Sequence, residues 1–268
     1  MRLKIATWNI NSVRLRAPNV VRFLNQFKPD VLCLQETKCP EGQFPSSTIA
    51  AAGYPHIAER GQSGYHGVAI VSRLPFTNRR SRDFCKMGDA RHVAVTLEGD
   101  FPVNVHSFYV PAGGDVPDPD INDKFAHKLA FLEEMKRWLT SSAVSRMTPV
   151  VITGDLNVAP HENDVWSHKQ LLKVVSHTPV ETELLGKVQS AGRWVDAVRK
   201  HIPETQRLYT WWSYRARDWD AADKGRRLDH IWTDPKTARY STKAEVIRDV
   251  RGWDRPSDHV PVMVTLDV

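Results

Sequence analysis

Residues 149–157, P-V-V-I-T-G-D-L-N, constrain the fold more than any other segment of this chain. The run of β-branched and apolar residues predicts a buried central strand, and Gly154 then allows the backbone to turn sharply. Because side chains alternate along a strand, Asp155 and Asn157 can point to the same side, where one accepts a proton and the other donates hydrogen bonds. Taken alone, the segment also fits an Asx turn that closes an ordinary strand.

Apolar segments elsewhere predict further strands with helices between them. Strands are expected at residues 3–8, 31–35, 67–72, 93–97, 103–109, 227–233 and 262–266. Helices are expected from about residue 17 to 27, with Pro18 in the first turn, and from about residue 120 to 140, with one apolar face. Residues 159–205 mix helical stretches with loops, and no solenoid repeat is visible. This order predicts a layered α/β protein with two packed sheets.

The length of 268 residues and the hydrophobic content of 41% suit one sizeable core, so we expect a single domain over residues 1–268. No run approaches the roughly 18 apolar residues of a membrane helix, and the first residues lead into a strand instead of an apolar signal sequence. Cys33, Cys39 and Cys85 lack C-x-x-C spacing, which favours free thiols over disulfides or a zinc site. We therefore expect a cytoplasmic monomer with no membrane contact.

The formal net charge is +6 and the pI is near 9.3, a mild excess that favours a polyanionic partner only weakly. The distribution of charge is more informative, because basic groups interleave with aromatic ones as a phosphate backbone with exposed bases would require. The cationic clusters are Arg14 and Arg16; Arg79, Arg80 and Arg82; and Lys224, Arg226 and Arg227, while Trp211, Trp212, Tyr214 and Trp219 supply the rings.

Polar residues follow or end several predicted strands. If these ends converge, they supply a carboxylate for a hard divalent cation, a base, neutral donors and an imidazole held by a carboxylate. That set fits metal-assisted phosphodiester hydrolysis, whereas a purely structural explanation requires each polar end to be independent. The residues are Asn9, Asn11, Glu36, Tyr109, Asp155, Asn157, Asp258 and His259, with Asp229 inside its strand.

The chain resembles the endonuclease/exonuclease/phosphatase superfamily through six motifs in the expected order. These are W-N-I-N at 8–11, Q-E-T-K at 35–38, Tyr109-x-Pro111, G-D-L-N at 154–157, R-L-D at 227–229 and S-D-H at 257–259. Q-E-T-K with W-W-S-Y-R at 211–215 and R-L-D-H at 227–230 resembles the exonuclease III type of abasic-site endonuclease. The likeness, which runs from residue 3 to residue 266, implies a four-layer α/β sandwich of the DNase I-like type, with two mixed sheets flanked by helices.

The resemblance implies a cofactor and catalytic roles. Mg²⁺ would bind at Glu36, and Mn²⁺ could replace it because oxygen ligands accept both ions. Asp155 would activate or orient the attacking water, and Asn157 would hydrogen-bond the developing negative charge. His259, paired with Asp229, would contact the phosphate beside Tyr109. Further contacts to the metal are implied for Asn9, Asp155, Asn157, Asp258 and His259.

The resemblance also implies a DNA-binding surface. Trp212 and Leu228 would form an apolar pocket for a sugar that lacks its base, and Arg226 would lie at its edge, where relatives have an apolar residue. Asn11 and Arg14 would contribute further substrate contacts. The chain departs from the family pattern at two other positions, with Ser12 in place of a usual glycine and Ala112 in place of a polar residue after Pro111.

The function implied is an Mg²⁺-dependent DNA repair hydrolase that cleaves 5′ to abasic sites in double-stranded DNA and leaves a 3′-hydroxyl. Activity at 3′ ends, as a 3′-to-5′ exonuclease and a 3′-phosphatase, is expected as well. One alternative is a phosphatase or phosphodiesterase of small molecules or lipids, which would not need the aromatic and basic segment at 211–219. The other is a catalytically inactive DNA-binding module, which is disfavoured because every expected acidic position is filled.

Overall fold

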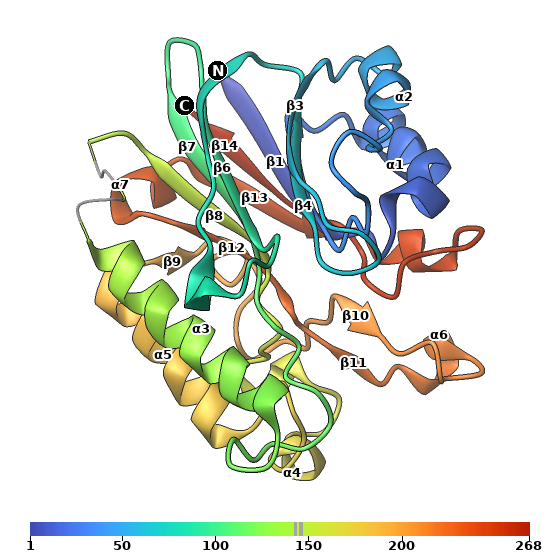
Figure 1. Ribbon diagram of the computed structural model, residues 1–268, viewed down its shortest axis with the longest axis vertical. Coiled ribbons are helices and arrows are strands. Elements are labelled where there is room, and N and C mark those ends of the chain that lie inside the picture. Colours follow the sequence, from blue (N-terminus) through green and yellow to red (C-terminus); the bar gives the residue numbers. More distant parts are fainter. Residues whose placement is uncertain (142–143, 145–146) are drawn as a thin grey trace.

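The computed structural model describes all residues except 142–143 and 145–146. Within the described residues, two six-stranded sheets form the centre of the molecule (Figure 1). The first has the order β13 (Ser241–Val246), β14 (Val262–Asp267), β1 (Arg2–Asn9), β2 (Val31–Gln35), β4 (Val68–Ser72) and β3 (His56–Arg60). The second has the order β5 (Phe76–Arg80), β6 (His92–Leu97), β7 (Val103–Tyr109), β8 (Val150–Asp155), β12 (Asp229–Thr233) and β9 (Val195–Asp196).

Helices cover the outer face of each sheet. On the first sheet lie α1 (Val13–Phe27) and α2 (Ser46–Ala51), and on the second lie α3 (Asp123–Thr140) and α5 (Pro179–Gly192) (Figure 1). Between the sheets, β-branched residues such as Ile5, Val105 and Ile231 form one buried cluster. Two further clusters lie between each sheet and its helices. The four-layer α/β sandwich is therefore confirmed, and β1–β2 and β7–β8 are its parallel pairs in otherwise antiparallel surroundings.

Strand β8 lies between β7 and β12 and is buried along its whole length. Gly154 has φ 144°, and a Cβ atom there would lie 2.0 Å from the carbonyl oxygen of Phe108. Only glycine allows this close approach of β8 to β7. The register that results places Asp155 opposite both Tyr109 on β7 and Asp229 on β12.

Several predicted boundaries were wrong. Strand β12 begins at Asp229 instead of at Arg227, because Arg226 pairs with Trp211 in a separate arm. That arm comprises β10 (Trp211–Trp212), α6 (Trp219–Ala222) and β11 (Gly225–Arg226). Helix α3 begins at Asp123, where Asn122 caps it, and α1 begins at Val13 with a break at Arg16.

Some elements lie outside the predicted segments. They include β3, β5, β13 and the short helix α7 (Pro235–Ala238), whereas α4 (His168–Leu171) lies in residues 159–205, where helical stretches were expected. Cys33, Cys39 and Cys85 are free, as expected. Among the helices of the described residues, none has the length and apolar character needed to cross a bilayer.

A buried ion cluster anchors the chain immediately before Asp229. Arg227 donates to Asp164 at 2.8 Å and to Asp196 at 2.6 Å, and Arg199 also donates to Asp164. Burial tends to raise the pKa of Asp164, but the two guanidinium groups outweigh it and lower the pKa to about 2. Arg227 is thus a structural residue and is not available to DNA, contrary to its place in the predicted basic cluster.

We expect Asp164→Asn to lower the free energy of unfolding by about 3–5 kcal/mol at pH 7, because two buried guanidinium groups lose their shared carboxylate. The contribution of Asp164 is fully present above the unfolded-state pKa near 4 and is lost as pH falls through the folded-state pKa of about 2. Urea unfolding at pH 7 and at pH 3 measures both effects. Asp120→Asn, at an exposed position, is the control; equal unfolding midpoints for the two variants would contradict the prediction.

Candidate active site

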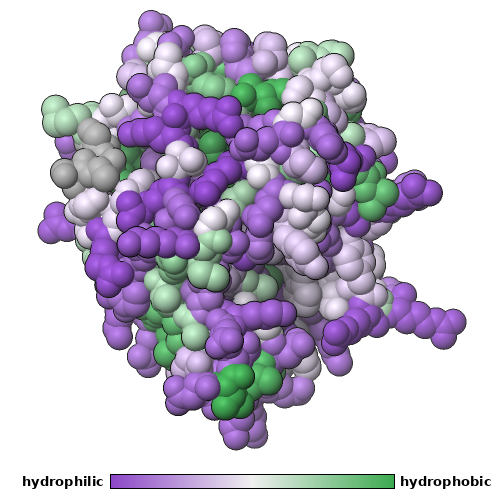
Figure 2. Space-filling view, in the orientation of Figure 1, coloured by the Kyte–Doolittle hydropathy of each residue, from purple (hydrophilic) through white to green (hydrophobic). Residues whose placement is uncertain are grey.

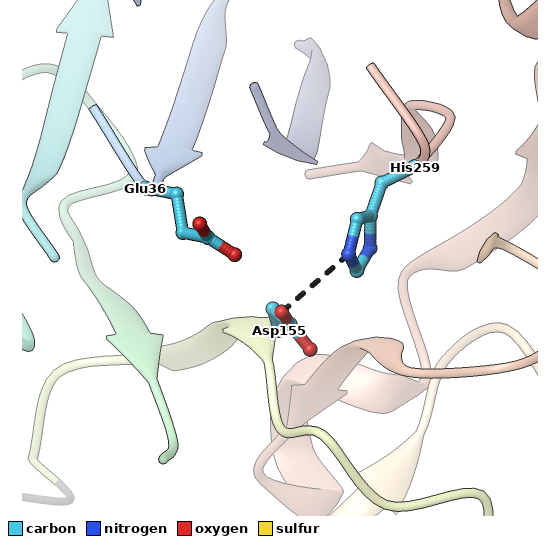
Figure 3. A group of neighbouring side chains, drawn as sticks. All are labelled: Glu36, Asp155 and His259. Atoms are coloured by element: carbon cyan, nitrogen blue, oxygen red, sulfur yellow. Dashed lines mark ion pairs between the residues drawn. The ribbon is translucent and has the colours of Figure 1, made fainter. Parts of the chain in front are cut away.

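Polar side chains from both sheets meet where β1, β2 and β8 end and β12 begins. The amide nitrogen of Asn9 donates to Glu36 Oε1 at 2.9 Å and to Asp155 Oδ2 at 2.8 Å. The side chains of Glu36, Asp155 and His259 point toward one another (Figure 3), and each offers a ligand atom within 4.8 Å of the others. The convergence predicted from the strand ends is therefore present in the structure.

Left-handed backbone conformations turn two of these side chains inward. Glu36 has φ 47° directly after β2, and Asn157 has φ 53° two residues after β8. The backbone nitrogen of Asn157 donates to Asp155 Oδ1 at 2.9 Å, and its side-chain nitrogen donates to Val110 O at 2.9 Å and Asp155 Oδ2 at 3.1 Å. This Asx turn fixes the direction of the Asp155 carboxylate.

Asp155 carries the most unusual carboxyl group of the site. Complete burial raises its pKa, the positive charge of His259 opposes that rise, and the nearby carboxylates of Asp229 and Glu36 add to it, so that the pKa lies at about 7. For Glu36, burial also acts upward, but the Lys38 ammonium at 2.9 Å and the Asn9 amide bring the pKa below its usual value. The crowding of carboxylates suits a divalent cation, which would relieve their repulsion.

His259 is held by Asp229, as predicted. Its Nδ1 lies 2.8 Å from Asp229 Oδ2, which also accepts a hydrogen bond from Thr210 Oγ1 at 2.6 Å. Burial acts to lower the pKa of His259, but Asp229 and Asp155 outweigh it and raise the pKa to about 10. The imidazole is therefore charged near neutral pH, which suits a phosphate contact better than the metal contact that the resemblance also implied.

Tyr109 lies beside Glu36 and Asp155 at the end of β7. Burial raises its pKa well above the usual value, the two carboxylates raise it further, and the Arg91 guanidinium opposes them. The phenol therefore stays protonated and can donate a hydrogen bond. Arg91 lies 4.8 Å from the centre of the ring and donates to the Tyr109 carbonyl oxygen at 3.3 Å.

Asp258 stands outside the three-residue cluster but close to it. It accepts from Asn11 Nδ2 and from Trp211 Nε1, both at 3.0 Å. Lys38 donates to Asn11 Oδ1 at 2.6 Å and so links Asn11 to Glu36. Lys38 was not among the predicted site residues, although its position two residues after Glu36 in Q-E-T-K was a usable signal.

An open cavity of about 610 Å³ extends from Glu36 and His259 toward an apolar wall. Leu228 forms part of that wall, as predicted, and packs with Trp166 and Trp211. Trp212 does not line the cavity. It is 2% exposed, packs on Tyr209 and Val260, and donates to Asp223 at 3.0 Å.

The assignment of Trp212 to the pocket was therefore wrong, and Trp211 takes that place. Neighbouring residues on β10 point in opposite directions, so only one of the two indoles can face the cavity. Trp166 was missed altogether, because residues 159–205 gave no clear pattern.

The arginines that were predicted to contact DNA differ in how accessible they are to it. Arg226 lines the cavity, donates to Val175 O and Ser176 Oγ at 2.9 and 2.8 Å, and lies 5.2 Å from the centre of the Trp211 ring. Arg14 is exposed and donates to Gln43, whereas Arg16 is buried against Asn11 and Tyr214. Hydrophilic residues cover most of the face shown in Figure 2.

Comparison with known proteins agrees with the fold. The family model described as Endonuclease/Exonuclease/phosphatase family matches residues 6–259. Exodeoxyribonuclease III of Haemophilus influenzae is 28% identical over 273 residues, which cover 97% of this chain and 98% of that protein.

Two solved structures are similar to this chain in both sequence and fold. An AP endonuclease from Archaeoglobus fulgidus is 32% identical with a TM-score of 0.91, over 99% of this chain and 100% of its own. A 3′-5′ exonuclease from Neisseria meningitidis is 30% identical with a TM-score of 0.90, over the same shares. Fold and site together define a phosphodiester hydrolase with the DNase I-like fold. The chain belongs to the endonuclease/exonuclease/phosphatase family and, within it, to the exonuclease III type of abasic-site endonuclease.

We expect Asp229→Asn to lower the pKa of His259 from about 10 toward the ordinary range, because the nearest carboxylate is removed. NMR titration of the histidine ring carbons in EDTA-treated protein measures this pKa, and a His259→Gln spectrum identifies the signal. Asp254→Asn, at an exposed position, should leave it unchanged. A His259 pKa that is the same in the wild type and Asp229→Asn would show that this pair does not set the charge.

Proposed function

We propose that the protein is an Mg²⁺-dependent DNA repair phosphodiesterase that cleaves double-stranded DNA 5′ to abasic sites and leaves a 3′-hydroxyl. The observation that carries this proposal is the placement of the Glu36, Asp155 and His259 cluster at one end of a cavity with an apolar wall. The similar structures include an AP endonuclease from Archaeoglobus fulgidus and a 3′ phosphatase from Neisseria bound to a product DNA hairpin. These relatives support activity on abasic sites and on 3′ ends for this chain as well.

Mg²⁺ fits the donor set, and Mn²⁺ fits it too. Glu36 offers a hard carboxylate oxygen, Asp155 and Asp258 offer further oxygens nearby, and Asn9 and Asn157 are within reach of the same carboxylates. Such an ion, when bound, supplies a Lewis acid that neutralises charge on the phosphate. We assign His259 to the phosphate, because the imidazolium held by Asp229 can donate to a phosphate oxygen through Nε2 but has no lone pair for a metal.

The side chains of the protein then divide the remaining work. Asp155 accepts a proton from the attacking water, because its carboxylate is held in one direction by Asn9 and Asn157 beside His259. As the water oxygen bonds to phosphorus, the bond from phosphorus to the 3′ oxygen breaks. The imidazolium of His259 stabilises the phosphate charge, and Asn157 orients Asp155. Tyr109 transfers its phenolic proton to the leaving 3′ oxygen, which becomes the 3′-hydroxyl, and the phenol recovers a proton from solvent.

Selection of abasic sites is assigned to the apolar wall. Trp166, Trp211 and Leu228 suit a deoxyribose without a base, which leaves the helix at little cost because no base pairing or stacking is lost. A normal nucleotide costs a few kcal/mol to extrude and then meets the indole rings. The Arg226 guanidinium beside Trp211 is available at the edge of the cavity, where a phosphate can approach it.

We further propose that the chain works as a single-domain monomer in a reducing compartment, the cytoplasm. The free thiols of Cys33, Cys39 and Cys85 support the reducing environment. The remaining alternative, hydrolysis of small phosphodiesters or lipids, would need the carboxylate cluster but not the aromatic wall.

A panel of labelled substrates tests the proposal. It comprises an abasic duplex, a blunt duplex, a nicked duplex with a 3′-phosphate, and a phosphoinositide, each with Mg²⁺ and with EDTA. Incision of the abasic duplex that requires Mg²⁺ and leaves a 3′-hydroxyl is the expected result. Turnover of the phosphoinositide without incision of any duplex would overturn it.

Asp155→Asn should reduce the incision rate by about 10²–10³-fold, because it removes the proton acceptor and a charge that aligns His259. Glu36→Gln should instead raise the Mg²⁺ concentration needed for half-maximal rate. Single-turnover incision over a range of Mg²⁺ concentrations separates the two effects, with DNA affinity from a gel-shift assay as the control. Wild-type incision by Asp155→Asn would remove this residue from catalysis.

The two neighbouring indoles give opposite predictions. Trp211→Ala should lower incision of abasic DNA far more than hydrolysis of a simple phosphodiester, with little effect on stability. Trp212→Ala should lower the free energy of unfolding by about 3–5 kcal/mol, because a buried ring is deleted. Kinetics on both substrates together with urea unfolding test the pair, and equal kinetic losses on both substrates for Trp211→Ala would return that residue to a structural role.

A further inference from the structure

Helix α3 carries a lysine that is completely buried. Lys128 has a side-chain exposure of 0%, which is rare for lysine unless the ammonium is paired. Its Nζ donates to the Asn157 carbonyl oxygen at 2.7 Å, to the Ala112 carbonyl oxygen at 3.3 Å and to the carboxylate of Glu181. Two of the three contacts are therefore to the backbone of residues that line the cavity.

Glu181, in the first turn of α5, extends the same arrangement. Its carboxylate, also 0% exposed, accepts from the Ser176 backbone nitrogen at 2.9 Å and from Thr178 Oγ1 at 2.6 Å. Ser176 in turn accepts from Arg226, whose guanidinium lies over Trp211. The Lys128–Glu181 pair thus contacts three separate cavity-lining segments and, through Ser176, the arginine at the cavity edge.

We propose that Lys128 and Glu181 are positioning residues that set the cavity for incision, by fixing the backbones of Ala112, Asn157 and Ser176 relative to one another. Capping of α5 explains only part of the arrangement, because the Lys128 contacts go to loops that belong to neither helix. The loop that contains Ala112 also packs closely against the aliphatic part of the Lys128 side chain. Gly113 has φ 91°, and a Cβ atom there would lie 2.9 Å from Lys128 Cδ.

Because both charges are buried, the stability of the protein depends on keeping them paired. Removing either partner leaves the other as an unpaired buried charge, which is strongly destabilising. Replacing both by neutral groups removes that penalty, and the loops are then held only by packing. The double variant Lys128→Met/Glu181→Gln therefore tests the positioning role. It preserves the side-chain volumes approximately and leaves no unpaired buried charge.

This inference rests on the proposed function, and its test has two readouts. The first is kcat and KM for abasic duplex, measured at a temperature where the double variant is fully folded. We expect kcat/KM to fall about 10²-fold, as expected for a displacement of about 1 Å at the site, with the fall mainly in kcat. The single variant Lys128→Arg keeps a charged donor opposite Glu181, so its kcat/KM should fall less than that of the double variant.

A control lysine that also donates to two backbone carbonyl groups lies outside the cavity lining. Lys200 donates to the Ala238 and Ser241 carbonyl oxygens at 2.6 and 2.9 Å. Because Lys200 is exposed, Lys200→Met should change stability little and leave kcat/KM unchanged. If the double variant loses stability but keeps the wild-type kcat/KM, the pair is structural and the inference is overturned.

The second readout does not depend on activity. Amide hydrogen exchange at Ser176 and Thr178, which donate to Glu181, should accelerate in the double variant, together with exchange in the Ala112 loop. Unchanged exchange in both segments would overturn the inference even if the variant were slow. A wild type that does not incise abasic DNA would count against the proposed function alone, since exchange still decides whether the pair holds these segments.

Discussion

Burial of the Asp155 carboxylate between the two sheets is the constraint on which the site depends. A buried carboxylate is tolerated only when donors or cations surround it. Here Asn9 from the first sheet, Asn157 from the loop after β8 and the charged His259 supply them. Because these partners come from different layers, the site exists only when the sandwich is fully packed. The close approach of β7 and β8 at Gly154 sets the register that brings Tyr109 beside the same carboxylate.

Much of this arrangement was predictable from sequence. Short apolar segments that end in polar residues point to a common edge when their strands are parallel neighbours, as β1 and β2 are, and as β7 and β8 are. That pattern made Glu36, Tyr109 and Asp155 candidates, and the resemblance supplied their roles. The hydrogen bond between Asp229 and His259 joins residues 30 positions apart and followed from the resemblance, which the structure confirms.

Other features depend on three-dimensional pairing and could not be predicted. Trp211 and Trp212 are adjacent and chemically identical, and only the pairing of β10 with β11 decides which indole faces the cavity. Lys128 occupies a buried position on α3, but its partners on three separate segments leave no periodic signal in the sequence. Arg227 likewise reads as a surface cation until Asp164 and Asp196 are found against it.

The central claim is that the crowded carboxylates at the cavity form a divalent-cation site. A crystal soaked in Mn²⁺ and measured at the manganese absorption edge tests it most directly. The account predicts an anomalous peak about 2–2.3 Å from a Glu36 carboxylate oxygen, on the side facing Asp155. A well-ordered crystal with Mn²⁺ bound elsewhere and no peak between these carboxylates would contradict it.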